Sequence, residues 1–326
     1  MVTSREDFKK AIAEGYEWYW DGVQEDYKQH ETKYDKIADV KSFEDIKGDH
    51  ASMTSGVGMD EIPEKDENEA IELFNPTEGF TVLIKKRRHS VIVPASQELD
   101  EDFNRAASFL KDYAKNDLPR AVRMTKDRIV AKLLDRGFET GGDAIYNNTC
   151  PTATDASGDL VYDSKPLLAK SGNKREAKNG DEYYNALDAE VLSYDSLVTA
   201  DNLLTITNAK MENGQEIDLD HNKKLVVKKN KIKAKTILNS ALVPGSQNND
   251  SNELQGEYDV IYMPYLSNDY YWFGIIGGFG MAFYDSDPTI KFFQDQNTGE
   301  FRVRIYLPLA YGIYNWRGFV GSDATS

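Results

Sequence analysis

The longest helical pattern in the chain runs from Ser96 to Phe138. Apolar side chains recur there at spacings of three and four residues, which places them on one stripe of a helix. Ser96 is a favourable N-cap, and the acidic residues after it suit the positive end of the helix dipole. Pro119 lacks a backbone N–H, so we expect a kink or break near Asp117 and Leu118. About 40 residues at about 1.5 Å each would span roughly 60 Å, which requires elongated surroundings or neighbouring subunits.

Residues 59–95 predict a long two-stranded hairpin. An acidic strand over Glu69–Phe74 and a strand over Phe80–Val93 flank the turn sequence NPTEG. An isolated hairpin is only marginally stable in water, so we expect it to lie on another surface. Charge runs are usually solvated or ion-paired faces, although a basic run could also contact phosphate. The second strand carries five consecutive basic or titratable positions: Lys85, Lys86, Arg87, Arg88 and His89.

The N-terminal 33 residues are polar with scattered aromatic side chains. They form either a mobile arm or a segment that folds against another surface. Residues 34–58 predict a short extended piece and a loop. One helical face could run through five apolar positions: Phe8, Ile12, Tyr16, Tyr19 and Trp20.

The second half of the chain predicts loops, then short helices, then strands. Residues 139–197 are rich in loop-forming residues. Helices are predicted over Ser196–Glu212 and Lys229–Leu242, with a buried strand over Lys224–Val227 between them. From Tyr258 onward the pattern is that of strands. The second helix should point Ile232, Thr236, Ile237 and Leu238 inward, and the last long strand should share one face through Phe301, Val303, Ile305, Leu307 and Leu309.

Composition and charge narrow the function classes. The chain has 326 residues, 40% of them hydrophobic, and a formal charge of -16. That charge argues against a nucleic-acid surface spread over the whole molecule but allows local basic patches. A single cysteine, Cys150, excludes an intrachain disulfide. No apolar run reaches the length of a membrane span, so we expect a soluble protein made inside a cell.

Candidate chemistry is sparse. Asp218, Asp220 and His221 are the nearest approach to a metal cluster, but a polar turn explains them better. The glycine-rich stretch Gly274–Gly280 does not match a dinucleotide-binding loop and is more typical of strand and turn packing. No nucleophile elbow, Cys–His signature or phosphate-binding loop is present. We therefore expect no catalytic residues, no metal and no cofactor, and an enzyme has no positive support.

Several motifs in order carry a family resemblance. IPEKDENEAI, then Gly79, then VIVPASQELDEDF form a hairpin-to-helix passage. KKLVVKKNKIKAKTILNSALVPGSQNNDSNEL forms a strand, a helix and a loop, and YDVIYMPYLSNDYYWFGI and RVRIYLPLAYGIYNWRGFVGS form closing strands. Between them, GDLVYDSKPLLAKSGNKREAKNG keeps its family motif only in part, at Val161-Tyr162 and Lys165-Pro166. Over roughly residues 35–326 the chain resembles the major capsid proteins of tailed bacteriophages, which have the Hong Kong 97 fold, and especially the Mu-like head subunits.

The resemblance implies an α+β fold with four parts. It assigns an N-terminal arm to residues 1–33, an extended hairpin loop to 60–95 and an axial α/β domain to 217–298. The hairpin would lie on the next subunit, and a long spine helix over 97–138 would span a flat shell tile. The peripheral domain would comprise 34–59, 96–216 and 299–326.

The resemblance also implies a function. The chain would be a structural protein, not an enzyme, that assembles into hexamers and pentamers of an icosahedral head around double-stranded DNA, without sequence-specific binding. Its partners would be further copies of itself and portal, scaffold and decoration or tail-connector proteins, with no membrane. It would be assembled in the host cytoplasm and become part of the virion capsid. The implied intersubunit contacts are Lys85, Lys86, Arg87, Arg88, Glu67, Glu69, Glu72, Trp316 and Arg317.

Three other interpretations remain. An encapsulin-like shell would keep the fold and enclose an enzyme cargo instead of DNA. A cytoplasmic enzyme would build its site from dispersed Asp and Tyr residues and form a small oligomer with a concave pocket. A tail or adhesin β-protein is disfavoured by the long helix.

Overall fold

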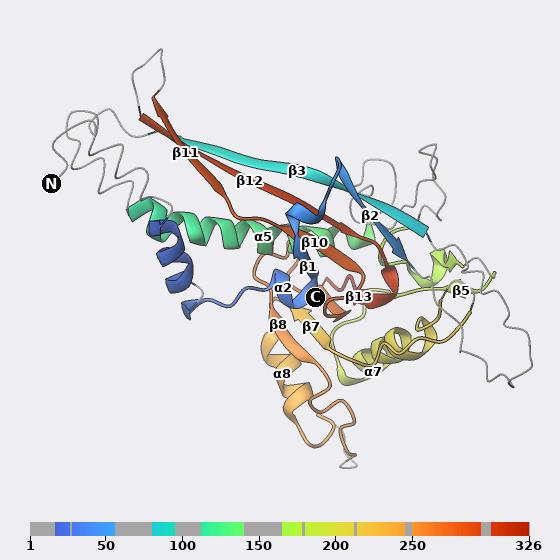
Figure 1. The fold of residues 1–326 in the computed structure, drawn as a ribbon. Coiled ribbons are helices and arrows are strands. Elements are labelled where there is room, and N and C mark those ends of the chain that lie inside the picture. The colour runs from blue at the N-terminus through green and yellow to red at the C-terminus, as the bar shows by residue number, and fades with distance from the viewer. Residues whose placement is uncertain are drawn as a thin grey trace, which may run out of the picture.

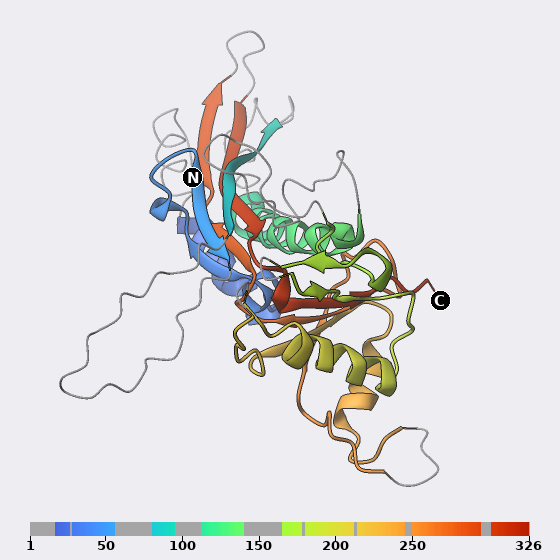
Figure 2. The same cartoon turned by 90° about the vertical axis from the view of Figure 1, so that its right-hand side faces the viewer.

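The computed structural model describes residues 17–26, 28–55, 80–94, 112–139, 165–177, 180–211, 214–244, 250–294 and 301–325. These residues form an elongated limb, in which a long helix runs beside long strands, and a rounder lobe below it (Figure 1). A view turned by 90° shows the long helix on one side of the limb's strands (Figure 2). The predicted α+β class is confirmed.

The limb is built on a six-stranded sheet with the order β1–β10–β12–β3–β2, in which β11 also pairs with β12. Only the β1–β10 pair is parallel, and the other pairs are antiparallel. The strand bounds are β1 (Asp39–Ser42), β2 (His50–Ser55), β3 (Phe80–Pro94), β10 (Met281–Asp285), β11 (Thr289–Gln294) and β12 (Phe301–Ile313).

The long basic strand β3 is not part of an isolated hairpin. It pairs with β2 from Phe80 to Lys85 and with β12 from Lys86 to Pro94. The described partners of β3 are therefore β2 and the distant β12, and the predicted hairpin with Glu69–Phe74 stays a prediction. The acidic segment Glu69–Phe74, its expected partner, lies outside the described residues.

The lobe contains a five-stranded sheet with the order β6–β13–β9–β7–β8. Two helices, α7 (Tyr194–Asn202) and α8 (Lys231–Asn239), belong to this lobe, and a π-helical turn, η5 (Leu203–Thr207), continues α7. The strand bounds are β6 (Ala186–Leu187), β7 (Lys223–Val227), β8 (Asp259–Tyr262), β9 (Trp272–Ile276) and β13 (Phe319–Ser322), and a separate pair joins β4 (Arg175–Glu176) to β5 (Glu182–Tyr183).

The sequence located the lobe's elements but not all of their faces. The predicted strand before α8 is confirmed as β7, and α7 begins at Tyr194 because Ser193 and Ser196 form a capping box. In α8, Ile237 and Leu238 are buried as expected. Ile232 and Thr236 point outward, so their predicted inward orientation is wrong.

The two sheets do not follow the expected domain ranges. Strand β13 lies in the lobe's sheet although its residues fall in the predicted peripheral domain. Strands β10 and β11 lie in the limb's sheet although their residues fall in the range 217–298. The division into domains stays a prediction.

The predicted spine helix is confirmed over its described part. A π-helical turn, η2 (Tyr113–Asp117), leads into α5 (Leu118–Asp135), and a 3-10 turn, η3 (Arg136–Phe138), ends it. Of the expected kink or break near Asp117 and Leu118, the structure shows a local change to a π turn and no break, because both residues keep helical backbone angles. A proline conflicts with the carbonyl four residues before it in an α-helix, and the wider π turn accommodates Pro119 without a break.

The described part of the N-terminal arm packs on the spine helix of its own chain. Residues 17–26 are helical, and Tyr19 and Val23 are buried in the main core. Asp26 pairs with Arg123 of α5 at 2.5 Å between Oδ2 and Nε. Trp20, however, is 39% exposed, so the predicted apolar face is only partly buried. Phe8, Ile12 and Tyr16 lie outside the described residues.

Behind this arm, the short helix α2 (Tyr34–Ile37) is held by a buried carboxylate. Oδ1 of Asp127 accepts hydrogen bonds from the backbone N–H of Lys33 at 3.0 Å and of Tyr34 at 3.1 Å. Lys126 pairs with Asp285 at the end of β10, at 2.6 Å. The spine helix therefore connects the N-terminal segment to the central sheet.

The core fills the space between the spine helix and both sheets. Leu133 and Leu134 of α5 pack in the same apolar cluster as Phe283, Leu309 and other sheet residues. The predicted apolar face of β12 is confirmed for its described side chains, since Ile305, Leu307 and Leu309 are all buried. A second cluster fills the lobe beneath α7 and α8.

Candidate assembly surface

The basic run on β3 divides between two faces of the sheet. Lys86 donates from Nζ to the carbonyl of Ile46 at 3.1 Å and lies over the ring of Phe43, 5.1 Å from its centroid. Arg87 lies over the ring of Tyr311, with Cζ 4.7 Å from the centroid. Burial raises the pKa of the Tyr311 hydroxyl. Strand geometry turns successive side chains to opposite faces, so the run is not one continuous positive surface.

Lys85, Lys86 and Arg88 are the exposed members of this run, and Lys86 is held by Ile46 and Phe43. Neither Lys85 nor Arg88 makes an ion pair within the part of the chain that the structure describes. Of the predicted intersubunit contacts in this run, Lys85 and Arg88 are therefore the two that a neighbouring subunit could still make. Lys86 and Arg87 stabilise their own chain.

One edge of β3 is unpaired along its outer half. From Arg87 to Pro94 the strand pairs with β12, and no described strand pairs with its other edge. Val91 is 51% exposed and Ile92 50% exposed, on opposite faces. An unpaired edge with exposed apolar side chains is a template on which another extended chain can pair.

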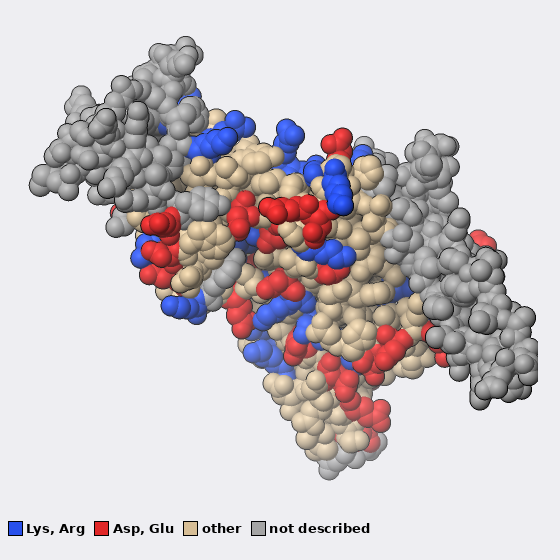
Figure 3. All heavy atoms as spheres, in the orientation of Figure 1, with Lys and Arg blue, Asp and Glu red and all other residues tan. Residues whose placement is uncertain are grey.

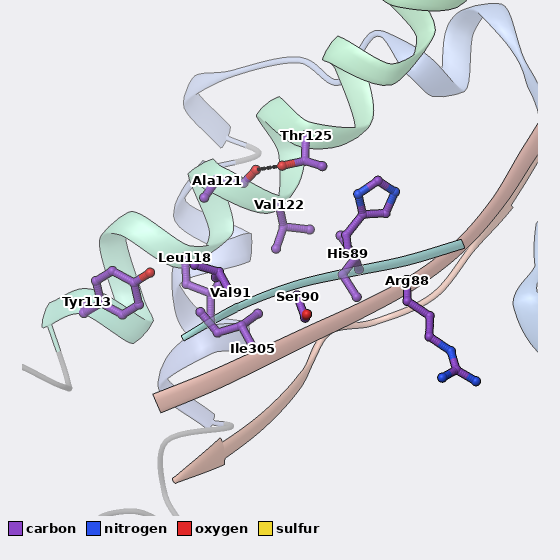
Figure 4. A pocket seen from close by; sticks show the side chains of 11 residues that line it. Arg88, His89, Ser90, Val91, Tyr113, Leu118, Ala121, Val122, Thr125 and Ile305 are labelled. Carbon is purple, nitrogen blue, oxygen red and sulfur yellow. Dashed lines mark hydrogen bonds between the residues drawn. The ribbon is translucent and has the colours of Figure 1, made fainter. Parts of the chain in front are cut away.

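A groove runs beside this edge, between α5 and the strands β3 and β12. It has a volume of about 400 Å³ and is lined largely by apolar side chains of the helix and both strands. Figure 4 shows His89 pointing up toward the helix and Arg88 pointing away from it. Residues that line the groove include Val91, Leu118, Val122, Ile305 and Leu307.

His89 is the imidazole that lines this groove. Burial lowers its pKa, and the positive charges of Arg87 and Lys132 lower it further. Its Nε2 atom is buried without a hydrogen-bond partner among the described residues. The neutral imidazole is therefore favoured, and it lies close to Tyr311, with ring centroids 6.2 Å apart.

Trp316 and Arg317 are buried in their own chain rather than exposed for a neighbour. Both belong to the 3-10 turn η6 (Trp316–Gly318) before β13. The guanidinium of Arg317 lies 4.6 Å from the Trp316 ring centroid, and that of the fully buried Arg175 lies 4.7 Å from it. Arg317 also donates from Nε to the carbonyl of Lys210. In this conformation the two residues hold the chain's C-terminal part to the lobe.

The remaining predicted positions bring no further chemistry to this surface. Glu67, Glu69 and Glu72 lie outside the described residues. Asp218 accepts a hydrogen bond from the backbone N–H of Asp220 at 2.9 Å, which is the turn expected for this segment. The glycine-rich stretch forms β9 and the turn into β10, where Gly278 and Gly280 have φ values of 79° and 81°.

The described residues contain neither a metal-binding cluster nor a membrane-spanning helix. No group of three or more His, Cys, Asp or Glu side chains in those residues could hold a metal ion. None of the helices in them is both long and apolar enough to cross a membrane. Neither the groove nor the open strand edge was predicted from the sequence. The sequence feature that indicates the open edge is the apolar pair Val91-Ile92 at the end of a basic strand.

Comparison by sequence finds no relatives for this chain. No protein-family model matches it. No curated protein matches it either.

Comparison by structure finds capsids. The chain is similar to the capsid of Ralstonia phage GP4, with 11% identity, a TM-score of 0.50 and coverage of 90% of this chain and 91% of that one. It is equally similar to the capsid of an empty GTA particle, with 11% identity, a TM-score of 0.50 and coverage of 90% and 91%. A virus-like particle from Pyrococcus furiosus matches at 8% identity and a TM-score of 0.44, covering 94% of this chain and 99% of that one.

These likenesses show the fold. The chain has the Hong Kong 97-type capsid fold that the sequence motifs indicated, with its long helix beside long strands and a separate lobe. A sequence identity of 11% to these two capsids supports the shared fold and no particular branch of capsid proteins. The Mu-like branch stays a prediction.

Proposed function

We propose that the chain is the major capsid protein of a tailed bacteriophage, which assembles into the hexamers and pentamers of an icosahedral head around double-stranded DNA. The observation that carries this proposal is the capsid fold itself, present over 90% of the chain. As the resemblance implies, the subunit would act as a structural tile, with no cofactor, and be assembled in the host cytoplasm. A portal, a scaffold and decoration or tail-connector proteins would be its further partners.

The open edge of β3 supports self-assembly. A single copy leaves this edge and the exposed pair Val91 and Ile92 without a partner among the described residues. Contacts of this kind are individually weak, but a shell repeats them many times, and repetition multiplies small contributions into a stable particle. We propose that a neighbouring subunit covers this part of the limb, with Lys85 and Arg88 at the rim of the contact.

Electron microscopy of the purified chain, with size-exclusion chromatography beside it, tests the proposal. Shells, tubes or rings of five and six subunits are expected. A chain that stays monomeric at high concentration and under crowding would contradict self-assembly. Ile92→Glu should shift the chain from assemblies to single subunits, because it places a charge on the contact without disturbing a buried position.

A matched control distinguishes the loss of a contact at the β3 edge from a general effect of added negative charge on assembly. Ile206→Glu makes the same substitution at a side chain that is 65% exposed on η5, which continues α7 in the lobe. It should leave assembly unchanged. If both variants assembled like the unchanged chain, the edge of β3 would not be the contact, although the capsid proposal would stand.

The encapsulin-like alternative keeps the same fold and differs only in content. Native particles should be treated with nuclease, opened and analysed for nucleic acid and protein. Nuclease-protected double-stranded DNA supports the virus head. A single enriched partner protein without DNA supports the compartment.

A further inference from the structure

Seven lysines lie within the short segment KKLVVKKNKIKAK, which contains β7 and the start of α8. Three of the first four pair with carboxylates, and the fourth bonds to a tyrosine hydroxyl. Lys223 pairs with three carboxylates, Lys224 pairs with Asp259 at 2.5 Å, and Lys228 pairs with Asp269 at 2.8 Å. Lys229 donates from Nζ to the hydroxyl of Tyr270 at 2.7 Å. These lysines therefore stabilise the fold and leave little free charge.

The last three lysines are different. Lys231, Lys233 and Lys235 are all exposed on α8, and none pairs with a carboxylate of the residues that the structure describes. The buried side of α8 is formed by Ala234, Ile237 and Leu238. Residues four apart lie on one face of a helix, so Lys231 and Lys235 share a flank of α8.

That flank faces a cleft between α8, β8 and the segment after the N-terminal helix. The cleft has a volume of about 360 Å³. A second cavity, of about 680 Å³, shares Lys36, Lys235, Val260 and Ile261 with it and extends toward β7. The lysine cleft is defined by five cationic side chains that line the first cavity: Lys33, Lys36, Arg123, Lys231 and Lys235.

The carboxylates near the lysine cleft are already engaged. Glu31 pairs with Lys36 at 2.7 Å, and this contact lowers the pKa of its carboxyl group. Asp35 accepts a hydrogen bond from the hydroxyl of Thr32 at 2.6 Å. Lys36 balances the charge of Glu31, Asp35 keeps its charge, and Lys231 and Lys235 pair with no carboxylate of the described residues. Figure 3 shows basic side chains, with acidic ones among them, where Figure 1 places α2, β8 and α8.

We propose that the lysine cleft binds the phosphate backbone of a nucleic acid. Lysine is a compact point charge that suits phosphate, and a local basic patch on an acidic protein is the electrostatic footprint of such binding. Tyr262, 41% exposed beside Lys231, adds an aromatic face at the rim. Contacts from lysine to phosphate carry no sequence information, so we expect the binding to be sequence-independent.

An acidic peptide fits the cleft less well. Peptides are usually anchored by side chains that enter apolar pockets. Here the apolar wall is formed by Val260 and Ile261, and Ile261 is already buried against the core. The free recognition elements are charges on the flank of a helix. The inference rests on the proposed function, since packaged DNA is the nucleic acid that a capsid subunit would meet. The binding experiment itself needs only the purified chain.

Fluorescence anisotropy with a labelled 30-base-pair duplex measures the binding at several salt concentrations. Each lysine–phosphate contact steepens the dependence of log affinity on log salt by about one unit. Lys231→Gln with Lys235→Gln should therefore reduce that slope by about two and weaken binding about tenfold at low salt. The double substitution Lys47→Gln with Lys291→Gln makes the same charge change at exposed positions outside the cleft and should leave both values unchanged.

Three results would overturn the proposal. The first is that the cleft variant binds DNA like the unchanged chain, and the second is that the two double variants lose affinity equally. The third is that poly-glutamate displaces the labelled duplex from the unchanged chain as effectively as unlabelled DNA of equal charge. The last result would assign the cleft to an acidic peptide. Circular dichroism and denaturant unfolding show that the variants fold. Electron microscopy of the same variants shows whether assembly persists, so failure here is distinct from failure of the capsid proposal.

Discussion

Replacing Gly22 with alanine places a methyl group where the spine helix already has a backbone oxygen. A Cβ built on Gly22 lies 1.8 Å from the carbonyl oxygen of Lys115, and real Cβ atoms essentially never approach within 3.0 Å. The obstacle belongs to the backbone, so no side-chain rotation relieves it. Residues 17–26 must therefore move away from α5.

Two opposing terms set the size of the effect. Alanine is about 1 kcal/mol better than glycine inside a helix, which would favour the variant if the helix stood alone. Moving the helix exposes part of Tyr19 and Val23, and a buried apolar side chain contributes about 1.5–3 kcal/mol. The ion pair between Asp26 and Arg123 is also loosened. The packing loss exceeds the propensity gain, and we expect a net destabilisation of about 1–3 kcal/mol.

Hydrogen exchange measured by mass spectrometry reports this change locally. Gly22→Ala should speed exchange in peptides covering residues 17–26, while peptides from the five-stranded sheet keep their protection. Denaturant unfolding gives the change in free energy. Gly48→Ala is the matched control, because an added Cβ there meets nothing within 4 Å and should change stability by less than about 0.5 kcal/mol. Equal protection of residues 17–26 in both variants would refute the reasoning.

Four further substitutions, at three positions, probe buried or half-buried polar groups. Asp127→Ala leaves the N–H groups of Lys33 and Tyr34 without their acceptor and should lower the free energy of unfolding by about 1–3 kcal/mol, whereas Asp127→Asn, which keeps an acceptor, should lower it less. Arg317→Lys loses the planar stacking group and should lower the melting temperature in calorimetry. Because burial lowers the pKa of His89 below 6.5, the unfolded chain binds the proton first, so stability should fall as the pH drops through about 6.5. Thermal unfolding of His89→Gln should lack this component.

The features predicted correctly from sequence are those with a strong local signal. The spine helix combines a stripe of apolar residues with a long run free of glycine, and the structure shows it from Asp112 to Phe138. The buried face of β12 follows from strict alternation through Ile305, Leu307 and Leu309. A short run of aliphatic residues similarly located β7. In each case neighbouring residues alone determine the pattern.

The features that sequence missed depend on distant partners. Strand β3 pairs with β2 and β12, and residues of β12 lie more than 200 positions away, so no local pattern could select them. Trp316 and Arg317 were expected at an intersubunit contact because the family resemblance implied it. They are buried because Arg175 and a backbone carbonyl supply their partners inside the chain. The open edge of β3 became visible only once its pairing was known.

The same proline that predicted a break in the spine helix explains why the arm docks at that place. Pro119 has no N–H to donate to the carbonyl of Lys115, four residues earlier, as an α-helix would require. The chain widens into a π turn over Tyr113–Asp117 instead. Gly22 then approaches this carbonyl more closely than any residue with a Cβ could. A residue that should interrupt the longest helix therefore creates a contact point on it, and the contact is specific because only glycine fits on the other side.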